Sequence, residues 1–586
     1  MKELQYLNKY FIKYRNRFLL GIFITIVAQI FSLFTPRLVN KSINVIEEFL
    51  KNPTANTAEL KSELWLYVGL IVVASLISGF LTFLMRQTLI VMSRYVEFDL
   101  KNEIFKHYET LSQSFYKQNR TGDLMNRISE DVGKVRMYVG PAVMYTINTF
   151  IRFAVVIVYM YTVSPKLTLY TLLPLPLLSY CIFKLSTEIN KRSTTFQENL
   201  SHLSTFSQEF FSGIRVVKAY ALEDKNQKQF ENLAQESKAK NLSLAYANAL
   251  FGPLMLLLIG LSNLIVIYFG GLMYMDGTIP NIGTIAEFIL YVNMLTWPVA
   301  SIGWVSSLVQ EAEASQKRIN EFLKVEPEIQ NQNPNSSKIE GSIRFENVSF
   351  TYEDTDIQAL NNISFTLNKG ETLAILGKTG SGKSTLLALL SRLYEVQEGK
   401  VWIDNQEIKN LNLFDLRNSI GIVPQDAFLF SDSIKNNIKF GKEDATDAEV
   451  VVAAQNAVVH ENIIGFKNQY QTVLGERGIT LSGGQKQRVS IARALIKDPQ
   501  IFLLDDCLSA VDTETEEQIL NNLFKISENK TTILVSHRVS TAKNADKIII
   551  LEDGKIIQQG SHNQLVNEEG YYKELYFKQL SEKELS

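Results

Sequence analysis

The stretch Gly377-Lys378-Thr379-Gly380-Ser381-Gly382-Lys383-Ser384 has the pattern of a phosphate-binding loop. The apolar run at 372–376 before it predicts a strand, and residues 384–393 after it predict a helix. In this context the backbone N–H groups of the loop and the helix N-terminus face nucleotide phosphates. We expect Lys383 to reach the β- and γ-phosphates and Ser384 to offer its hydroxyl to Mg²⁺. The sequence therefore predicts a site for a nucleoside triphosphate.

A second motif, Leu481-Ser482-Gly483-Gly484-Gln485, lies further along the chain. The two motifs in this order resemble those of the ATP-binding cassette (ABC) family. In that family the pentapeptide closes over the γ-phosphate of ATP bound to a second cassette, so the resemblance implies that one chain does not complete a site. The residues that it implies for binding ATP are Tyr352, Gly377, Lys378, Thr379, Gly380, Ser381, Gly382, Lys383, Ser384, Thr385, Gln425, Ser482, Gly483, Gly484, Gln485, Asp505 and His537.

Four of these positions are implied as catalytic or metal-binding residues. The apolar run 501–505 ends in Asp505, which matches the Walker B carboxylate that holds Mg²⁺; Ser384 and Gln425 complete the implied metal set. Gln425 matches the Q-loop glutamine and His537 the switch histidine on the γ-phosphate. Tyr352 matches the aromatic residue that stacks on adenine.

Asp506 stands where hydrolytically competent cassettes usually carry Glu, which polarises the attacking water. Its carboxylate is one methylene, or ~1.5 Å, shorter, and misplacement of this order can cost ~100-fold in rate. We list Asp506, His537 and Gln425 as catalytic candidates, with two alternatives for Asp506. Either Asp506 still acts as a weak base, or this site mainly binds ATP and hydrolyses little of it.

Length and composition favour several domains and give no reason to expect nucleic acid. The chain of 586 residues is too long to form a single hydrophobic core. Its net charge of −2 gives no electrostatic attraction to nucleic acid. Long uncharged runs lie in the first half only. The two cysteines, Cys181 and Cys507, and the scattered histidines indicate neither a disulfide framework nor a His/Cys metal cluster.

Six apolar stretches are predicted to cross a bilayer, which requires ~20 residues each. The fourth is the weakest, because it is short and contains Pro174 and Pro176. Ahead of the first, residues 1–17 combine helical apolar spacing with basic residues, which predicts an interfacial helix. The predicted spans are 18–38, 64–84, 139–163, 167–183, 252–275 and 285–308.

The distribution of Lys and Arg predicts the orientation. Basic residues are concentrated before the first span and in the two long connections between spans 2 and 3 and spans 4 and 5. By the positive-inside rule, both termini and these connections lie in the cytoplasm. We therefore expect a multi-pass protein of the inner (cytoplasmic) membrane whose nucleotide site is cytoplasmic.

The predicted fold class is an α-helical membrane domain with six transmembrane helices (ABC type 1), followed by an α/β P-loop NTPase domain. The predicted boundaries are an interfacial helix at 1–17, the membrane domain at 18–312, a linker at 313–340, the nucleotide-binding domain at 341–577 and a tail at 578–586. Residues 120–127 and 209–215, near the tips of the long connections, resemble the coupling helices of ABC exporters.

The resemblance implies an exporter half-transporter of the multidrug or lipid type. It would use ATP hydrolysis and alternating access to export a hydrophobic or amphipathic substrate, such as a drug, lipid or peptide. Its partners would be the lipid bilayer and a second half-transporter. The short carboxylate of Asp506 beside a consensus pentapeptide favours a different partner chain, and a homodimer stays open. The alternatives are an importer built on the exporter fold and a mainly regulatory half.

Arg152 is the most suggestive residue within the predicted spans, because a charge near the bilayer centre is costly unless it faces a cavity or a partner. Two roles stay open at this point. Arg152 either lies on the substrate pathway or pairs with polar groups such as Asn148 or another helix.

Overall fold

The computed structural model describes residues 2–51, 57–475, 478–509 and 511–584. By internal packing the chain divides into two compact units. The helical unit comprises Met1–Tyr108 and Gly122–Val325, and the α/β unit comprises Glu109–Thr121 and Glu326–Ser586. The segment 109–121 therefore belongs to the α/β unit, although the helical unit surrounds it in sequence.

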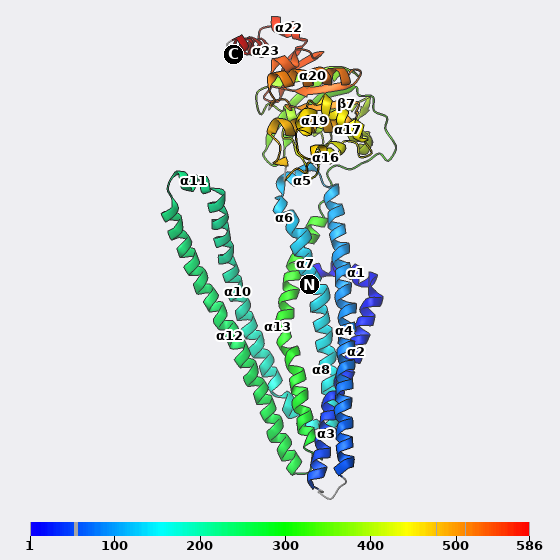
Figure 1. Ribbon diagram of the computed structural model, residues 1–586, viewed down its shortest axis with the longest axis vertical. Coiled ribbons are helices and arrows are strands. Elements are labelled where there is room, and N and C mark those ends of the chain that lie inside the picture. Colours follow the sequence, from blue (N-terminus) through cyan, green and yellow to red (C-terminus); the bar gives the residue numbers. More distant parts are fainter. Residues whose placement is uncertain (1, 52–56, 476–477, 510, 585–586) are drawn as a thin grey trace. The chain divides into compact units, whose positions relative to one another are not determined.

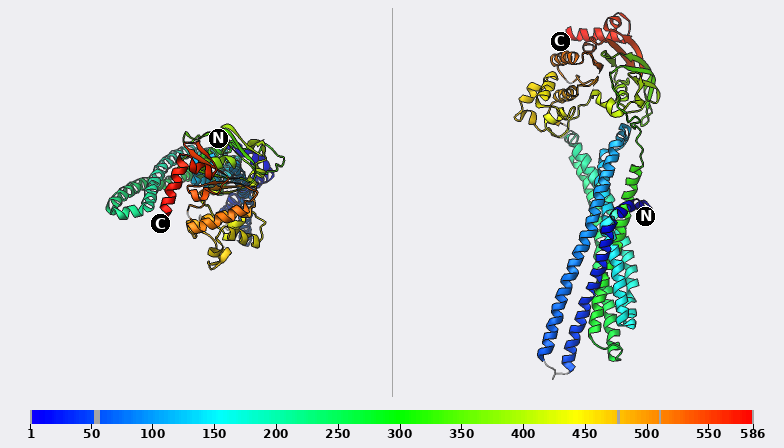
Figure 2. Two further views of the ribbon diagram at one scale, coloured as in Figure 1. Left: turned by 90° about the horizontal axis from the view of Figure 1, so that it is seen from above. Right: turned by 90° about the vertical axis from the view of Figure 1, so that its right-hand side faces the viewer.

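Long helices that run along a common direction form the helical unit, as Figures 1 and 2 show. The helices α10 and α12 lie side by side as a hairpin joined by α11. The helices are α1 (Asn8–Lys13), α2 (Arg15–Ser32), α3 (Phe34–Lys51), α4 (Thr57–Thr110), α6 (Thr121–Asn126), α7 (Val132–Met137), α8 (Val143–Val163), α9 (Pro165–Leu172), α10 (Pro174–Ser212), α11 (Ile214–Ala219), α12 (Glu223–Met275) and α13 (Gly283–Leu323). Short helical turns lie at Glu3–Leu7, Arg127–Asp131 and Tyr138–Ala142.

Within the described residues, five helical stretches are long and apolar enough to cross a membrane. Five of the predicted spans fall within them. The fourth, 167–183, is divided between α9 and α10, which meet at Leu173 ahead of Pro174. Proline lacks a backbone N–H and interrupts helical hydrogen bonding. This segment stays a prediction as a membrane span. The five stretches are Arg15–Lys51, Ala58–Thr110, Thr121–Val163, Glu223–Met275 and Gly283–Leu323.

The predicted interfacial helix at 1–17 is divided between a short 3₁₀ turn, α1 and the start of α2. Part of the apolar face expected in the membrane interface is buried in the protein instead, since Leu4 and Leu7 are buried. A carboxylate on α4 anchors this region, because Lys9 Nζ donates to Glu103 at 2.7 Å. Ile12 remains exposed, so an apolar surface is left for the interface.

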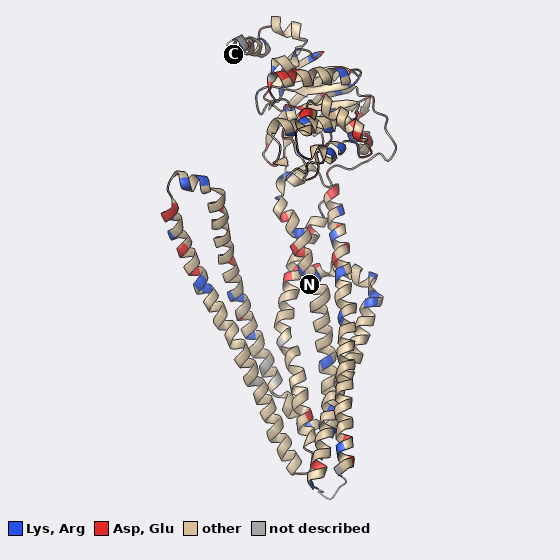
Figure 3. Cartoon of the chain, viewed as in Figure 1, with Lys and Arg blue, Asp and Glu red and all other residues tan. Residues whose placement is uncertain are grey.

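Charged residues gather toward the ends of the long helices, and tan stretches without them separate the ends (Figure 3). Arg152 on α8 is the one charged residue of the sequence between Arg136 and Lys166. Its Nε donates to Gln29 Oε1 on α2 at 2.8 Å, and Gln29 Nε2 donates to Asn148 Oδ1 at 2.6 Å. Arg152 is thus paired with a polar group on another helix, Gln29, which in turn binds Asn148.

The α/β unit contains two sheets. A four-stranded antiparallel sheet has the order β2-β1-β4-β5, and a six-stranded sheet has the order β10-β9-β3-β8-β7-β6. In the larger sheet β3 pairs in parallel with β8 and β9, and β7 with β6 and β8. The strands are β1 (Ile343–Tyr352), β2 (Ile357–Leu367), β3 (Thr372–Gly377), β4 (Glu398–Ile403), β5 (Gln406–Glu407), β6 (Ile420–Val423), β7 (Ile501–Asp505), β8 (Thr531–Val535), β9 (Lys547–Glu552) and β10 (Lys555–Gly560).

Helices and two main cores complete this unit. One core joins both sheets and includes the stacked rings of Phe345 and Phe365, 4.7 Å apart. The other joins β6 and β7 to the surrounding helices. The helices are α5 (Gln113–Gln118), α14 (Lys383–Leu390), α15 (Leu413–Asn418), α16 (Ile434–Lys439), α17 (Asp447–Asn456), α18 (His460–Ile464), α19 (Gly483–Ile496), α20 (Thr513–Ile526), α21 (Val539–Ala542), α22 (His562–Asn567) and α23 (Tyr571–Glu584).

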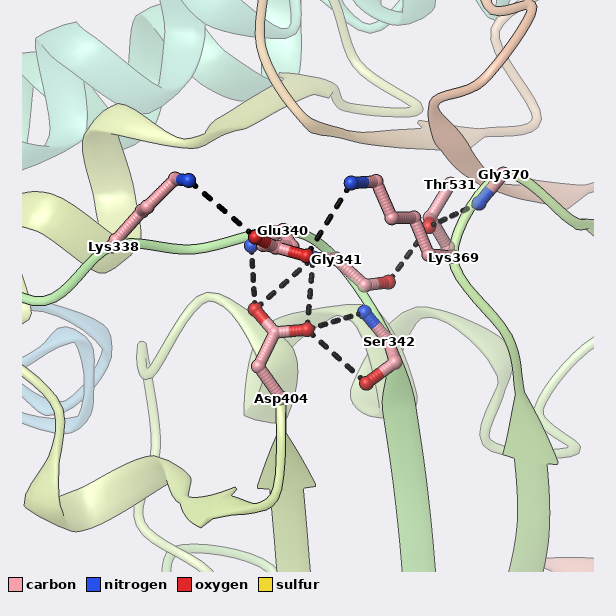
Figure 4. A network of polar contacts seen from close by, with 8 residues as sticks. All are labelled: Lys338, Glu340, Gly341, Ser342, Lys369, Gly370, Asp404 and Thr531. Atoms are coloured by element: carbon pink, nitrogen blue, oxygen red, sulfur yellow. Dashed lines mark hydrogen bonds and ion pairs between the residues drawn. The ribbon is translucent and has the colours of Figure 1, made fainter.

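A carboxylate binds the backbone just before β1 (Figure 4). Asp404, after β4, accepts hydrogen bonds from the backbone N–H groups of Glu340, Gly341 and Ser342 at 2.5, 3.0 and 2.8 Å. Thr531 Oγ1 donates to the carbonyl oxygen of Gly341 at 2.6 Å and thereby ties the entry to β8. The two sheets are thus linked at the point where the chain enters them.

Candidate functional site

A glycine-rich loop joins the buried strand β3 to α14, as the sequence predicts. Two of its glycines are required by close approach of the backbone. At Gly377 (φ 152°) a Cβ would lie 2.2 Å from the carbonyl oxygen of Leu551, and at Gly382 (φ 97°) it would lie 2.2 Å from that of Ala359. A side chain at either position would force the loop open.

Lys383, the first residue of α14, is buried inside the loop. Its Nζ donates to the carbonyl oxygens of Gly377 and Lys378 at 2.9 and 2.8 Å. Burial lowers the pKa of Lys383, and the nearby carboxylates of Asp506 and Asp505 act in the opposite direction. The ammonium therefore lies inside the loop, with the negative charge of two carboxylates nearby.

A cavity of about 350 Å³ opens next to this loop, within the size range of small-molecule sites. It collects residues that follow the carboxyl ends of β3, β6, β7 and β8, where open α/β sheets bind ligands. Sixteen of the seventeen lining residues come from the continuous part of the unit after 326, and the other is Lys117. The lining residues are Lys117, Tyr352, Thr355, Ile357, Ala359, Thr379, Gly380, Ser381, Gly382, Lys383, Ser384, Thr385, Gln425, Asp505, Asp506, Val535 and His537.

Two of the three predicted magnesium ligands are in direct contact. Ser384 is hydrogen-bonded to Asp505, and this bond opposes the effect of burial, which raises the pKa of Asp505. Mg²⁺ takes oxygen ligands and commonly uses one or two protein groups together with substrate phosphates and water. The hydroxyl and the carboxylate fit that ion. Gln425 lines the same cavity.

Asp506 and His537 line the cavity from neighbouring strands. The backbone N–H of Asp506 donates to the carbonyl oxygen of Val535 at 3.0 Å, which joins the end of β7 to the end of β8. Asp506 has a φ of 42°, a left-handed conformation that Asp tolerates better than most residues. The backbone thus fixes the position of the Asp506 Cα, and the length of the side chain determines how far the carboxylate reaches into the cavity.

Tyr352, predicted to stack on a base, is positioned by three neighbours. Its hydroxyl is hydrogen-bonded to Thr385 Oγ1 at 3.0 Å, and the rings of Phe350 and Tyr394 lie perpendicular to it at 5.0 and 5.4 Å. Its ring also carries Lys117 Nζ, 4.3 Å from the centroid. Lys117 was not predicted, and no local pattern marks it, because it lies 235 positions before Tyr352 in the sequence.

The second motif forms the N-terminus of α19, with Ser482 as the residue that caps the helix. Ser482 and Gln485 form a capping box, in which Gln485 N–H donates to Ser482 Oγ at 3.3 Å and Ser482 N–H donates to Gln485 Oε1 at 3.0 Å. Ser482 and Gly483 are exposed. Within the described chain, residues 482–485 are not part of the cavity lining. As far as the chain is described, the second motif therefore does not share the cavity beside the glycine-rich loop.

Two residues of the glycine-rich loop that were predicted to bind ATP also lie outside the cavity lining. Gly377 and Lys378 do not line the cavity as the described residues form it, and the ammonium of Lys378 binds Glu552 at 2.7 Å. Gln425, in contrast, is connected to the second motif's helix, because Gln487 Nε2 on α19 donates to its carbonyl oxygen at 3.1 Å.

Comparison with known proteins gives matches over both units. Residues 18–299 match the family model of the ABC transporter transmembrane region, and residues 360–509 match that of the ABC transporter. The chain is 34% identical to the probable multidrug resistance ABC transporter ATP-binding/permease protein YheI of Bacillus subtilis, over 98% of this chain and 97% of that protein. It is 33% identical to the multidrug resistance-like ATP-binding protein MdlA of Escherichia coli, over 98% and 96%. A solved bacterial Atm1-family ABC exporter with ATP bound is similar in structure, with a TM-score of 0.80, 26% identity and coverage of 96% of this chain and 98% of that one.

Proposed function

The chain belongs to the ABC transporter family, and from this premise we propose that it exports a hydrophobic or amphipathic compound by alternating access. Its fused membrane and ATP-binding regions make it a multi-pass membrane protein that binds nucleotide and couples ATP hydrolysis to transport. The relatives named as multidrug resistance proteins support an amphipathic cargo. The cavity that joins the loop to Asp505, Asp506 and His537 is the observation that carries the proposal.

In the proposed site each residue has one role. Tyr352 stacks on adenine, the loop and Lys383 hold the phosphates, and Ser384, Asp505 and Gln425 would hold Mg²⁺. The metal would supply charge neutralisation between the β- and γ-phosphates. His537 contacts the γ-phosphate, and Asp506 faces the attacking water. Hydrolysis forms a bond from the water oxygen to the γ-phosphorus, breaks the bond to the bridging oxygen and releases ADP and phosphate.

A half-transporter of this architecture implies a dimer, and we propose that the partner is a different chain. The exposed Ser482 motif supports a site shared between two chains, since it lies outside the cavity of its own described chain. The short carboxylate of Asp506 supports an unequal pair, with slow hydrolysis at this chain's ATP and faster hydrolysis at the partner's. A homodimer is the competing assembly.

For the location we propose the inner membrane, with both termini and the α/β unit in the cytoplasm. The concentration of Lys and Arg before the first predicted span, and between predicted spans 2 and 3 and spans 4 and 5, supports this orientation. Residues 209–215, at the junction of α10 and α11, are proposed as a coupling segment. Residues 120–127, near the tip of the first connection, are proposed as the other coupling segment, and the neighbouring α5 groups with the α/β unit.

Inside-out vesicles that contain the chain and its partner test both activity and direction. Export predicts that MgATP drives a fluorescent amphipathic dye into the vesicles, and that Lys383→Ala abolishes this uptake. Loss of preloaded dye on ATP addition would indicate an importer. Dye movement that is unaffected by Lys383→Ala would contradict the assignment of the nucleotide site.

A further inference from the structure

A lysine from α5 lies in the nucleotide cavity. The segment 109–121 packs as part of the α/β unit, although the chain on either side of it belongs to the helical unit. Lys117 lines the cavity together with Tyr352, and its Nζ lies 4.3 Å from the centroid of the Tyr352 ring. The same ammonium is paired with Asp354 Oδ2 at 2.9 Å. One side chain of this segment therefore touches the ring assigned to the base.

Side-chain contacts at the start and at the end of this segment hold it. At its start, Ser112 Oγ and Ser114 Oγ donate to Glu328 Oε2 at 2.7 and 2.8 Å. At its end, Lys117 is held by Asp354 and Tyr352. The hydrogen bond to Asp354 raises the pKa of Lys117, which keeps the group a cation at neutral pH. Of these contacts, those at the end include residues of the nucleotide cavity.

The Tyr352 ring has little freedom to avoid Lys117. Its hydroxyl is tied to Thr385, and Phe350 and Tyr394 pack against it at right angles. A cation placed over an aromatic face and a base stacked on that face require the same space. Stacking of a base on an aromatic ring is the stronger of the two contacts, because a partly exposed lysine keeps much of its hydration.

We propose that Lys117 and the nucleotide base compete for the face of Tyr352, so that ATP binding displaces Lys117 and detaches this end of the α5 segment. The proposal rests on the assignment of Tyr352 to adenine under the proposed function. Under this proposal, binding of the base, in addition to binding of the γ-phosphate, changes the contacts of the segment between α4 and α6. Coupling between two binding events is reciprocal. If bound nucleotide weakens the contact between Lys117 and Tyr352 by a certain factor, a movement that withdraws Lys117 therefore strengthens nucleotide binding by that same factor.

The test compares a ligand that has a base with one that lacks it. Binding of MgATP and of magnesium tripolyphosphate to the full chain in lipid nanodiscs is measured by titration calorimetry. Removal of the competing cation in Lys117→Ala should tighten MgATP about two- to fivefold, the range expected from an exposed cation–π contact. Binding of tripolyphosphate should not change, since it does not reach Tyr352.

Three variants control the comparison. Lys117→Gln keeps most of the side chain, removes the charge and should behave as Lys117→Ala. Lys117→Arg keeps a cation for the ring and should leave MgATP binding near the wild-type value. Lys338→Ala removes an exposed lysine that pairs with Glu340 outside the cavity lining, and should change neither ligand.

Weaker or unchanged MgATP binding in both Lys117→Ala and Lys117→Gln would overturn the proposal. An equal change for both ligands would also overturn it, because the effect would then come from phosphate charge. These outcomes are distinct from failure of the proposed function. In that case wild-type protein would bind neither ligand, or Lys383→Ala would leave both affinities intact, and the competition would be rejected with the site itself.

Discussion

The length of the Asp506 side chain gives a direct test of how this ATP site works. Its backbone is held by the hydrogen bond from its N–H to Val535 and has a φ of 42°. Substitution by Glu extends the carboxylate by one methylene, ~1.5 Å, and Glu, like Ala, is less stable than Asp in this left-handed conformation by about 1–2 kcal/mol. A change of this size at a water-orienting group can alter the rate ~100-fold, or ~2.7 kcal/mol in activation free energy. We expect Asp506→Glu to speed hydrolysis at this site, up to that limit.

Asp506→Asn is the matched variant, because Asn tolerates the left-handed conformation and keeps the side-chain size. An unequal dimer predicts that this change has little effect on total turnover and none on ATP binding, since a water-orienting group acts in the transition state. Alanine is a poorer probe at this position, because a left-handed backbone costs such a residue about 1–2 kcal/mol.

The assay is phosphate release by the purified dimer in nanodiscs, with nucleotide binding measured in parallel. Thermal unfolding of each variant separates a rate effect from a loss of folding. If Asp506→Asn stops turnover as completely as removal of the partner's corresponding carboxylate, Asp506 is a working catalytic residue and the unequal dimer is wrong. A Glu variant that is no faster than the wild type would refute the argument from side-chain length.

Three further predictions follow from contacts in the two units. Lys383→Ala should abolish ATP-dependent transport and leave the helical unit folded, because the ammonium binds phosphate; circular dichroism and transport assays check this, and normal transport would reject the site. Burial raises the pKa of Asp505 above that of an ordinary Asp, so its ionised form is lost at milder acidity as the pH falls. Magnesium-dependent nucleotide binding should weaken over that range, and calorimetry at several pH values should find this dependence missing in Asp505→Asn. Gln29→Leu removes the hydrogen-bond acceptor of Arg152 Nε and should destabilise the helical unit by about 1–3 kcal/mol in detergent unfolding. The double change with Arg152→Leu should recover part of that loss, and an unchanged midpoint in Gln29→Leu would show that the bond does not contribute to stability.

Features that depend on neighbouring residues were predictable from the sequence. The strand, glycine loop and helix around Lys383 form as expected, since a phosphate loop is defined by residues next to one another. The capping pair Ser482 and Gln485 is three positions apart, and it begins α19. The fold class was also predictable and is confirmed, because long apolar runs and alternating strand and helix patterns are local properties.

Predictions at segment boundaries were less accurate. Pro174 and Pro176 indicated a weak fourth span, but the sequence did not show that the helix is divided at Leu173. The coupling segments at 120–127 and 209–215 stay predictions. The sequence did not show that α5, a few residues before 120–127, packs in the α/β unit, because membership of a unit is decided by packing and not by helical composition.

By itself the sequence determined that this chain has a helical membrane region and a nucleotide-binding α/β region, and it predicts which side chains carry the phosphate chemistry. The tertiary structure decided which distant residues share a cavity. It placed Lys117 over Tyr352, Gln29 beside Arg152 and Asp506 beside Val535. The physical reason is that such contacts are set by strand order and helix packing, which join residues whose separation along the chain carries no signal.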